Sequence, residues 1–209
     1  MNILVTAGGT REPIDAVREI TNRSTGRLGR CIAEAFLAGG AAVTYVAGEG
    51  AETPAACEPL TLRRIRTVAD LSAVLEERLT AEPFDAVIHG MAVSDYAPVP
   101  TTGKIPSDEE TVTLTLRRLP KIIDRIKGWQ PSVRLFGFKL LAAADEAALA
   151  AAAAKLFSNA RCDYVLANTM AHIRGDAHPA LLFKAPGTVV GRAATKHEIA
   201  DLIFRRMHI

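Results

Sequence analysis

The stretch Met1-Asn2-Ile3-Leu4-Val5-Thr6-Ala7-Gly8-Gly9-Thr10 decides the fold class of this chain. Its first six residues are typical of a buried β-strand, and the two glycines predict a turn where that strand ends. A second run, Ser24-Thr25-Gly26-Arg27-Leu28-Gly29, predicts the start of the following helix with a hydroxyl side chain as its N-cap. A strand, a glycine turn and a helix start leave backbone N–H groups free to bind a phosphate group.

The segment between these two runs is long and charged. The run Arg11-Glu12-Pro13-Ile14-Asp15-Ala16-Val17-Arg18-Glu19-Ile20-Thr21-Asn22 exceeds the usual strand-to-helix connection of about 2–6 residues. This length favours a functional loop over an ordinary surface excursion, and its charged side chains should face solvent or a ligand. The glycine spacing is not the G-x-G-x-x-G fingerprint of dinucleotide-binding proteins. We therefore interpret the region as a phosphate-binding loop of another type.

Size and composition indicate an ordinary globular protein. The chain has 209 residues, of which 49% are hydrophobic and 23% are charged, and this predicts one domain over residues 1–209 with a full hydrophobic core. The formal net charge of +2 gives no field that would attract nucleic acid or a membrane surface. Aromatic residues make up only 5% of the chain, so few side chains are available to stack on single-stranded nucleic acid.

The cysteines and the first residues of the chain indicate the cellular compartment in which we expect the protein. Cys31, Cys57 and Cys162 are odd in number and form no C-x-x-C pair, which favours free thiols in a reducing compartment. The chain opens on a strand-like run without a basic leader, and it contains no long apolar stretch. We therefore expect a soluble cytoplasmic protein that is neither exported nor inserted into a membrane.

Apolar runs alternate with segments of helical periodicity, which is typical of an α/β fold. Strands are predicted at residues 2–6, 42–46, 60–62, 85–88, 112–116, 133–138 and 164–167. Helices are predicted at about 25–38, 68–81, 120–127, 144–160 and 195–207, with a C-terminal hairpin at 180–183 and 188–190. The expected architecture is a doubly wound, mainly parallel, Rossmann-like sheet with helices on both faces, which would bind its ligand at the carboxyl ends of the strands.

A polar segment follows the fourth predicted strand. The run His89-Gly90-Met91-Ala92-Val93-Ser94-Asp95-Tyr96 should emerge at the same sheet edge as the Gly8-Gly9 turn. Asp95 is either a residue that binds ligand hydroxyl or amide groups or a turn residue before Pro98. His89 is at least as well explained as a satisfied strand-end residue as it is as an acid or base.

The next segment predicts a flexible flap. Residues 100–110 are rich in turn formers and charge and lack periodicity, as is typical of a mobile surface segment. Lys104 within it is either a solvated loop lysine or a cation that closes on a polyphosphate and neutralises charge at the leaving group.

Six blocks of the chain, in the same order, resemble the phosphopantothenoylcysteine synthetase family, also called phosphopantothenate–cysteine ligases. The blocks lie at residues 6–26, 91–96, 103–105, 119–123, 137–141 and 163–168. The resemblance covers almost the whole chain, and six ordered blocks are far more specific than one glycine motif. The length is similar to that of the stand-alone form, without the decarboxylase domain to which many bacterial versions are fused.

The resemblance implies a two-step reaction in coenzyme A synthesis. The carboxylate of 4'-phosphopantothenate would attack the α-phosphorus of CTP or ATP, giving pyrophosphate and an acyl-nucleotide, expected to be an acyl-cytidylate. The amine of cysteine would then displace the nucleotide and form an amide. Mg2+ is expected to accompany the nucleotide, because it offsets triphosphate charge and assists the departure of pyrophosphate.

The resemblance also implies roles for individual residues. Those implied to bind the nucleotide are Gly8, Gly9, Ser24, Gly26, Gly29, Asp95, Pro120, Phe138, Lys155 and Asn168. Those implied to bind the substrate are Asn22, Ala92 and Asp95, together with Arg18 from the neighbouring subunit of a homodimer. Asn22, beside the acyl-nucleotide, and Lys104, which would stabilise charge in the activating step, are implied to be catalytic.

Three features depart from the family pattern. The run Gly137-Phe138-Lys139-Leu140-Leu141 replaces the Gly-Phe-Ala-Ala-Glu run of the fused bacterial forms, so the choice between CTP and ATP stays open, with CTP favoured. Lys155 is followed one turn later by Asn159, where the family tends to have a second lysine. One expected contact with the phosphate groups is therefore weakened or passes to Arg161. Lys121 stands where the family often has aspartate, and the sequence gives no physical account of that change.

Two other classes of function are compatible with the fold. A nicotinamide-dependent oxidoreductase would share the architecture, but the chain lacks both the G-x-G-x-x-G fingerprint and a Tyr-x-x-x-Lys pair. A nucleotide-binding module without catalysis is the second alternative. It would tolerate replacement of Asn22 and Lys104 without loss of any turnover, whereas a ligase would not.

Overall fold

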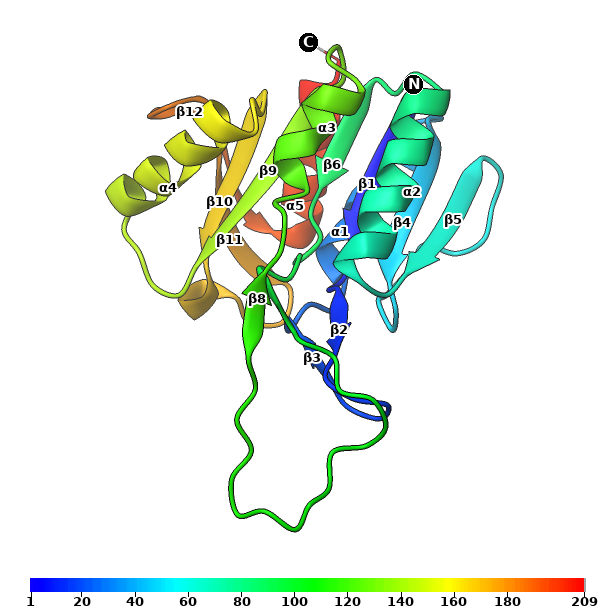
Figure 1. Cartoon of the computed structure of the whole chain (residues 1–209). Coiled ribbons are helices and arrows are strands. Elements are labelled where there is room, and N and C mark those ends of the chain that lie inside the picture. Colours follow the sequence, from blue (N-terminus) through cyan, green and yellow to red (C-terminus); the bar gives the residue numbers. More distant parts are fainter. Residues whose placement is uncertain (209) are drawn as a thin grey trace.

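The structure is a computed structural model that describes residues 1–208, and an eight-stranded sheet forms its centre. In spatial order the strands are β12 (Thr188–Thr195), β11 (Ala177–Ala185), β10 (Tyr164–Thr169), β9 (Arg134–Leu141), β6 (Ala86–His89), β1 (Asn2–Ala7), β4 (Ala42–Gly48) and β5 (Leu60–Ile65). The six strands from β10 to β5 are parallel, whereas β11 and β12 pair antiparallel. The chain winds outward from β1 to β5 and then returns to β6 on the other side of β1 (Figure 1).

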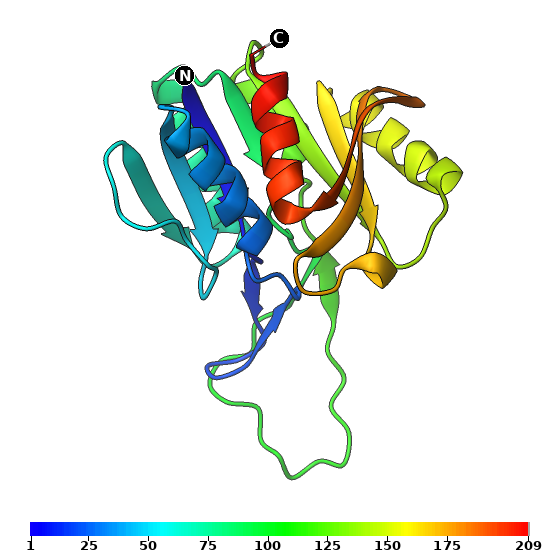
Figure 2. The same ribbon diagram turned by 180° about the vertical axis from the view of Figure 1, so that it is seen from behind.

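Helices cover both faces of this sheet. The helices are α1 (Arg27–Ala38), α2 (Val68–Ala81), α3 (Ile123–Trp129), α4 (Glu146–Asn159) and α5 (Lys196–Arg206). α1 and α5 lie side by side on one face, and α2, α3 and α4 lie on the other (Figures 1 and 2). Phe36 of α1 and Phe204 of α5 meet edge to face with ring centroids 5.4 Å apart, which joins the two helices of the first layer.

The apolar run that opens the chain becomes the central strand β1 because both of its faces are covered. Ile3 and Val5 are fully buried in the core beneath α1 and α5, whereas Leu4 is buried in the core beneath α2 and α3. Continuous apolar runs are typical of parallel strands with helices on both sides. The predicted doubly wound fold is confirmed, including the C-terminal hairpin formed by β11 and β12.

A projecting arm leaves the carboxyl-end edge of the sheet (Figure 1). It contains two small antiparallel sheets, β2 (Arg11–Pro13) with β3 (Glu19–Thr21) and β7 (Tyr96–Pro98) with β8 (Leu116–Arg118). The loop 99–115 joins β7 to β8 and corresponds to the predicted flap. It is held to the tip of the β2–β3 hairpin, because Ala16 donates its backbone N–H to the Gly103 carbonyl at 3.0 Å.

Two predicted elements were wrong in position. The alternating run at 112–116 is not a strand over its length, since only residues from Leu116 onward pair, as part of β8. Val112 and Leu114 are exposed on the loop, which carries them away from the central sheet (Figure 1). Helix α3 begins at Ile123 instead of residue 120, because the Leu119 N–H still donates to the Asp95 carbonyl at 2.9 Å and so extends the β7–β8 connection.

The connection between β1 and α1 also differs from the prediction. Residues 11–21 form the β2–β3 hairpin and not an irregular loop. The N-cap of α1 is Gly26, with φ of 78°, and not Ser24 or Thr25. The Thr25 hydroxyl, one residue before the N-cap, still accepts the Arg27 N–H at 3.3 Å. Glycine suits this position because it adopts a left-handed conformation without a Cβ penalty.

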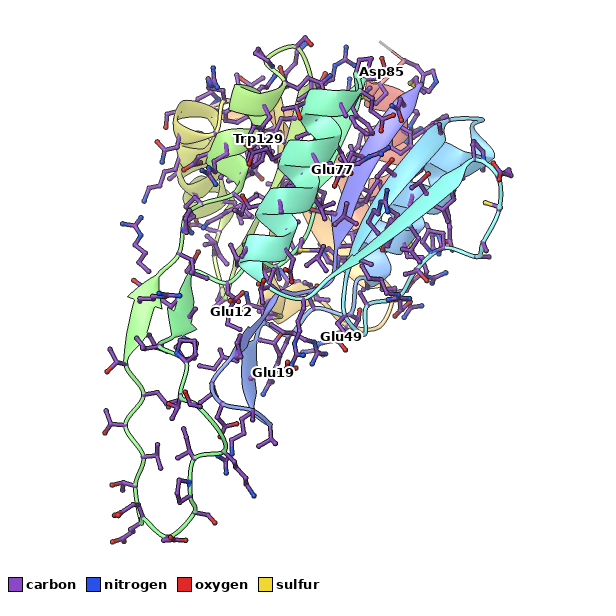
Figure 3. All side chains as sticks on the ribbon, turned by 45° about the vertical axis from the view of Figure 1, so that its right-hand side comes forward. Glu12, Glu19, Glu49, Glu77, Asp85 and Trp129 are labelled. Atoms are coloured by element: carbon purple, nitrogen blue, oxygen red, sulfur yellow. The ribbon has the colours of Figure 1, made fainter. Side chains whose placement is uncertain are left out.

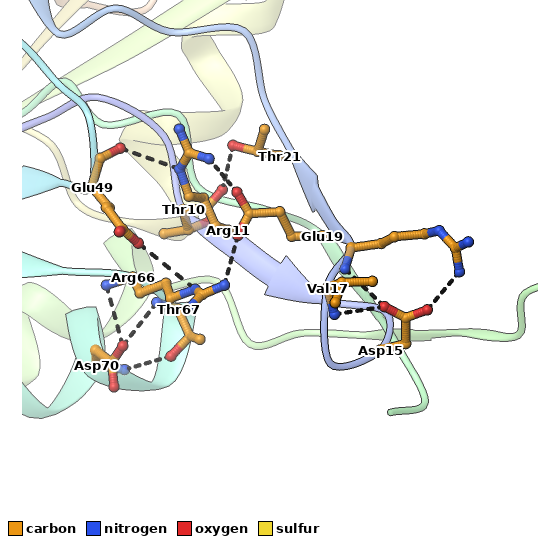
Figure 4. Close-up of polar contacts among 11 residues, drawn as sticks. Thr10, Arg11, Asp15, Val17, Glu19, Thr21, Glu49, Arg66, Thr67 and Asp70 are labelled. Atoms are coloured by element: carbon orange, nitrogen blue, oxygen red, sulfur yellow. Dashed lines mark hydrogen bonds and ion pairs between the residues drawn. The ribbon is translucent and has the colours of Figure 1, made fainter. Parts of the chain in front are cut away.

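The three carboxylates of this hairpin bind groups of the protein itself, which corrects the expectation that they face solvent or a ligand. The side chains of Arg11 and Arg18 stay partly exposed. Figure 3 shows Glu12 at the N-terminal end of α2, where its buried carboxylate accepts the Val68 N–H at 2.8 Å and so satisfies the helix end. Arg11 and Arg66 both form ion pairs with Glu19 (Figure 4). Burial raises the pKa of Glu12 above its usual value, with the Val68 hydrogen bond opposing that effect.

The expectation of buried free thiols is met for two of the three cysteines. Cys31 and Cys162 are free and buried, as expected, and burial raises the pKa of Cys162 to about 12, which leaves it unreactive. Cys57 is free but exposed. Among the helices described here, none has the length and apolar character needed to cross a bilayer.

Candidate functional site

The site begins where β1 and β6 end side by side. Thr6 and His89 are register partners at the carboxyl ends of these strands, and the winding of the sheet reverses between them. Beyond the strands, the Ala92 N–H donates to the Gly8 carbonyl at 2.8 Å and the Thr10 N–H donates to the Ala92 carbonyl at 3.3 Å. The Gly8-Gly9 turn therefore meets the Met91–Asp95 segment at one sheet edge, as predicted, and such a crevice is the usual ligand site of doubly wound folds.

A first cavity of about 370 Å³ opens beside the glycine turn and the start of α1. It is lined by Ala7, Gly8, Arg23, Ser24, Thr25, Gly26, Arg27, Leu28, Gly29, Gly90, Met91, Ala92, Phe138, Leu140, Asn168, Met170, Ile173, His178 and Lys196. The backbone of the glycine turn, the N-terminal end of α1 and the ends of β9 and β10 thus surround one space.

A second cavity of about 380 Å³ adjoins the first on the α3 and α4 side of the sheet. It is lined by His89, Met91, Val93, Ser94, Asp95, Pro120, Lys121, Ile122, Ile123, Asp124, Phe138, Lys139, Lys155, Leu156 and Asn159. Met91 and Phe138 belong to both linings and therefore form the shared wall. Two ligands could lie here with their ends close to each other.

The structure divides the residues expected to bind the nucleotide between these cavities. Gly8, Ser24, Gly26, Gly29 and Asn168 line the first cavity, together with the expected substrate residue Ala92. Asp95, Pro120 and Lys155 line the second, and Phe138 lines both. The residues that the sequence assigned to a single ligand, the nucleotide, therefore surround two adjacent cavities.

Asn22 and Gly9 lie at the junction of the arm and the sheet. The Asn22 side-chain Nδ2 donates to the Ala92 carbonyl at 3.2 Å, and a Cβ built on Gly9 would stand 2.9 Å from the Asn22 carbonyl oxygen. The close approach of these two backbones requires glycine at position 9. Asn22 is exposed and contacts a lining residue, so its amide lies beside the first cavity.

Lys104 and Arg18 line neither cavity. Lys104 is exposed on the loop of the arm. Arg18 donates to the Asp15 carboxylate at 2.7 Å and to the Ile105 carbonyl at 3.2 Å, so it ties the hairpin to that loop. Within one chain these two residues stand apart from the other expected site residues.

The glycines of the first cavity also serve packing. A Cβ on Gly29 would stand 2.4 Å from the Ala7 Cβ, so glycine lets α1 approach β1 closely. Gly8 and Gly26 have φ of 83° and 78°, and a Cβ on either would come within 2.9 Å of the Ala51 Cβ. Because Gly8 and Gly26 have no side chain of their own, their backbone groups stay open to a ligand in the first cavity.

His89 and Asp95 both line the second cavity, one as a buried ring and the other in an ion pair. His89 is buried, and this burial lowers its pKa to about 4, so the ring is neutral at pH 7. Its Nδ1 lies 3.0 Å from Thr6 Oγ1, which also accepts the Met91 N–H at 3.3 Å. Asp95 forms an ion pair with Lys121, and this pair accounts for the lysine that the sequence left unexplained. Asn159 lines the cavity beside Lys155, whereas Arg161 lines neither cavity.

A family model described as the DNA/pantothenate metabolism flavoprotein C-terminal domain matches residues 1–209. The chain belongs to this family. A solved family structure, the DNA/pantothenate metabolism flavoprotein from Streptococcus pneumoniae, is 35% identical and superposes with a TM-score of 0.92, covering 100% of this chain and 98% of that one. The C-terminal domain of a coenzyme A biosynthesis bifunctional protein CoaBC is 25% identical, with a TM-score of 0.77 over 99% of this chain and 93% of that one.

Among full-length relatives, the coenzyme A biosynthesis bifunctional protein CoaBC of Thermococcus kodakarensis is 34% identical over 202 residues. The match covers 97% of this chain but 49% of that protein. The chain thus spans about half the length of the curated relatives it matches.

Sequence reasoning missed several residues that line the two cavities. Arg23, Arg27, His178 and Lys196 line the first cavity, and Met91 forms part of the shared wall. His178 and Lys196 were missed because they belong to the C-terminal hairpin and α5, and no local pattern indicates that these elements lie near the glycine turn. The two arginines stand beside Ser24 and Gly26 in the sequence, so their position next to a glycine-rich turn was the available signal.

Proposed function

We propose that this chain is a phosphopantothenate–cysteine ligase of coenzyme A synthesis. The observation that carries the proposal is the pair of adjoining cavities with a common wall at Met91 and Phe138, in a chain whose 34% identical relative is named as a coenzyme A biosynthesis protein. The reaction needs two phosphate-bearing substrates, a nucleoside triphosphate and 4'-phosphopantothenate, whose reacting groups must meet. Two cavities that share a wall suit that requirement, because proximity of the reacting atoms supplies much of the catalysis.

The chemistry follows from the poor reactivity of a carboxylate toward an amine. Attack of the substrate carboxylate on the α-phosphorus of the nucleotide forms a mixed anhydride and releases pyrophosphate; the cysteine amine then attacks the acyl carbon, loses a proton and displaces the nucleotide. Asn22 suits a position beside the anhydride, because its amide can donate and accept hydrogen bonds but does not ionise. Lys104 would reach the triphosphate by movement of the loop 99–115, adding positive charge where negative charge develops.

The lining of the second cavity is compatible with a metal–nucleotide complex. Asp124 lines it and forms no ion pair within residues 1–208, and Mg2+ usually takes one or two carboxylates together with substrate phosphates. No group of three or more His, Cys, Asp or Glu side chains suited to a metal occurs within residues 1–208, so the ion would arrive with the nucleotide. When bound, it would offset triphosphate charge. We favour CTP over ATP as the nucleotide.

We further propose that the functional unit is a homodimer assembled through the arm. The arm exposes large apolar side chains: Val17, Tyr96, Val99, Val112, Leu114 and Leu116. Exposed apolar groups gathered on one projection are typical of a protein–protein contact. Arg18 lies on the same arm, so pairing would allow it to reach the partner's site, as its assigned role requires. Free thiols at Cys31 and Cys162 suit a cytoplasmic location.

The decisive experiment measures pyrophosphate release with 4'-phosphopantothenate, cysteine and either CTP or ATP. We expect release that depends on phosphopantothenate, with amide product only when cysteine is present. Saturable NADPH binding without pyrophosphate release would favour an oxidoreductase and refute the ligase. Sedimentation of the protein, with Leu114→Asp as the variant, tests the dimer; an unchanged dimer in that variant would exclude this surface.

A further inference from the structure

Lys196 is a buried lysine with which no carboxylate of residues 1–208 forms an ion pair. This first residue of α5 is only 6% exposed, and its ammonium group donates to the Gly175 carbonyl at 2.5 Å. None of the ion pairs formed within residues 1–208 involves Lys196. A buried ammonium without a counter-charge is unfavourable, and a cation at a helix N-terminus also opposes the helix dipole.

The cavity around this ammonium group is cationic. Lys196 lines the first cavity with Arg23 and Arg27, and the described lining contains no aspartate or glutamate. Arg27 has a distant partner in Asp176 at 3.6 Å. The N-termini of α1 and α5 lie at the same end of the molecule, beside each other (Figure 2). Their positive dipole ends add to the charge of the side chains, and an enclosed region of one charge attracts a ligand of the other.

The neighbouring histidine does not share this charge. His178 is buried, and its Nε2 lies 2.9 Å from the Asn168 Nδ2. With the amide as the donor, the neutral ring accepts through Nε2 and keeps its proton on Nδ1. Burial, and then the charge of Lys196, lowers the pKa of His178 to about 4. The ring of His178 is therefore neutral at pH 7 and fixes the orientation of Asn168, so that Lys196 is the cationic side chain at this end of the cavity.

We propose that Lys196 binds the phosphate monoester group of the substrate in the first cavity. One of its three N–H donors is used by Gly175, which leaves two for phosphate oxygens. The unfavourable burial of the charge in the free protein is then offset when a phosphate enters. The identity of the substrate, 4'-phosphopantothenate, rests on the proposed function, whereas the anion site does not.

Thermal unfolding with and without inorganic phosphate tests the anion site. We expect phosphate to raise the Tm of the wild type and of Lys196→Arg but not of Lys196→Met. Without phosphate, Lys196→Met should be at least as stable as the wild type, because it removes an unbalanced buried charge. An equal phosphate response in the wild type and Lys196→Met, or none in the wild type, would overturn the proposal.

Lys127 supplies a matched control. It is also a buried lysine, but it forms an ion pair with Asp163 at 2.7 Å and lies outside both cavities. Lys127→Met should lower the Tm, because Asp163 loses its partner, and should keep the phosphate response. A loss of phosphate response in this variant as well would show that the effect of Lys196→Met is not local, and the proposal would fail.

Calorimetric binding of 4'-phosphopantothenate and of pantothenate tests the substrate assignment. Lys196→Met should weaken binding of the phosphorylated ligand about tenfold or more, which is about 1.4 kcal/mol per tenfold, with no change for pantothenate. Equal weakening of both ligands would refute contact with the phosphate group. If the wild type responds to inorganic phosphate but binds no phosphopantothenate, the anion site stands and the proposed ligase function fails.

Discussion

The carboxylate of Asp95 forms an ion pair with the ammonium group of Lys121 at the edge of the second cavity. Both side chains are about half exposed, at 56% and 48%, so the pair contributes only about 0–1 kcal/mol to stability. We expect a larger effect on ligand binding, because Lys121 joins Lys139 and Lys155 among the cations that line this cavity. The pair also neutralises a carboxylate that would otherwise repel a triphosphate.

Lys121→Ala should therefore impair nucleotide binding more than stability. We expect the KM for the nucleotide to rise about threefold to tenfold, the size of effect that follows from losing one exposed charge contact, while the Tm changes by about a degree or two. Steady-state kinetics and thermal unfolding measure both quantities. Lys184→Ala, at an exposed lysine outside both cavities, should change neither; a fall in Tm without a change in KM would assign Lys121 a structural role only.

Lys104→Gln should slow the activating half-reaction and leave the fold intact. Lys104 is exposed on the loop of the arm and contributes nothing to either core cluster. Loss of its charge where negative charge develops should reduce the rate of pyrophosphate release by about a hundredfold or more. Rapid-mix measurement of pyrophosphate release provides the test, with the same substitution at Lys184 as the control. A normal rate of release would contradict the role.

Asn22→Asp should impair amide formation. The Asn22 amide donates to the Ala92 carbonyl, and an aspartate oxygen at that position would repel it and place negative charge beside the acyl phosphate. We expect product formation with cysteine to fall about tenfold to a hundredfold, with little change in Tm because the residue is exposed. Product analysis after a single turnover measures this. Unchanged amide yield would dismiss the proposed position of Asn22.

Asp15 should control the docking of the loop 99–115. Its carboxylate accepts the N–H groups of Val17 and Arg18 at 2.8 Å and of Ile105 at 3.0 Å. These hydrogen bonds, that of Val17 foremost, lower its pKa from 3.8 to about 2. The stabilisation is complete above pH 4 and is lost as the pH falls through 2, because protonation removes the charge that the N–H groups bind.

The test for Asp15 is proteolysis of the loop. Asp15→Asn should increase cleavage within 99–115 at least several-fold at pH 7, because the amide cannot accept all of these bonds through one oxygen. Asp108→Asn, an exposed carboxyl on the same loop, should leave the cleavage rate unchanged. Equal protection of the wild type and Asp15→Asn would rule out this anchor.

His89 should make stability depend on pH in mild acid. Burial lowers its pKa from 6.5 to about 4, so the unfolded chain takes up a proton before the folded one does. The stability present above pH 6.5 is lost as the pH falls to 4. Since a tenfold change in proton affinity is about 1.4 kcal/mol, the loss reaches about 3 kcal/mol.

Denaturation at several pH values checks this expectation. His89→Asn removes the titrating group and should flatten the decline between pH 6.5 and 4, with the remainder coming from His178, whose pKa is also lowered to about 4. His197→Asn, at an exposed position on α5, should keep the wild-type profile. An identical decline in His89→Asn and the wild type would mean that the ring is not neutral in the folded protein.

The sequence determined the scaffold because its signals are local. Apolar runs such as residues 2–6 are buried on both faces, and helical periodicity marks α2 and α5 almost to the residue. The Gly8-Gly9 turn and the segment after β6 could be placed at one sheet edge, because parallel strands direct their carboxyl ends the same way. The strand predicted at 112–116 was wrong, because alternation of apolar and polar residues does not show whether a neighbouring strand is available for pairing.

Only the tertiary structure decided how the site is divided and charged. Phe138 separates two cavities because β9 lies next to β6, and Lys196 reaches the glycine turn because α5 packs beside α1. Glu12 and Asp15 are buried because distant backbone N–H groups bind their carboxylates. These contacts join residues that are far apart in the sequence, such as Gly8 and Lys196 in the first cavity. No local pattern of apolar or charged residues encodes such contacts.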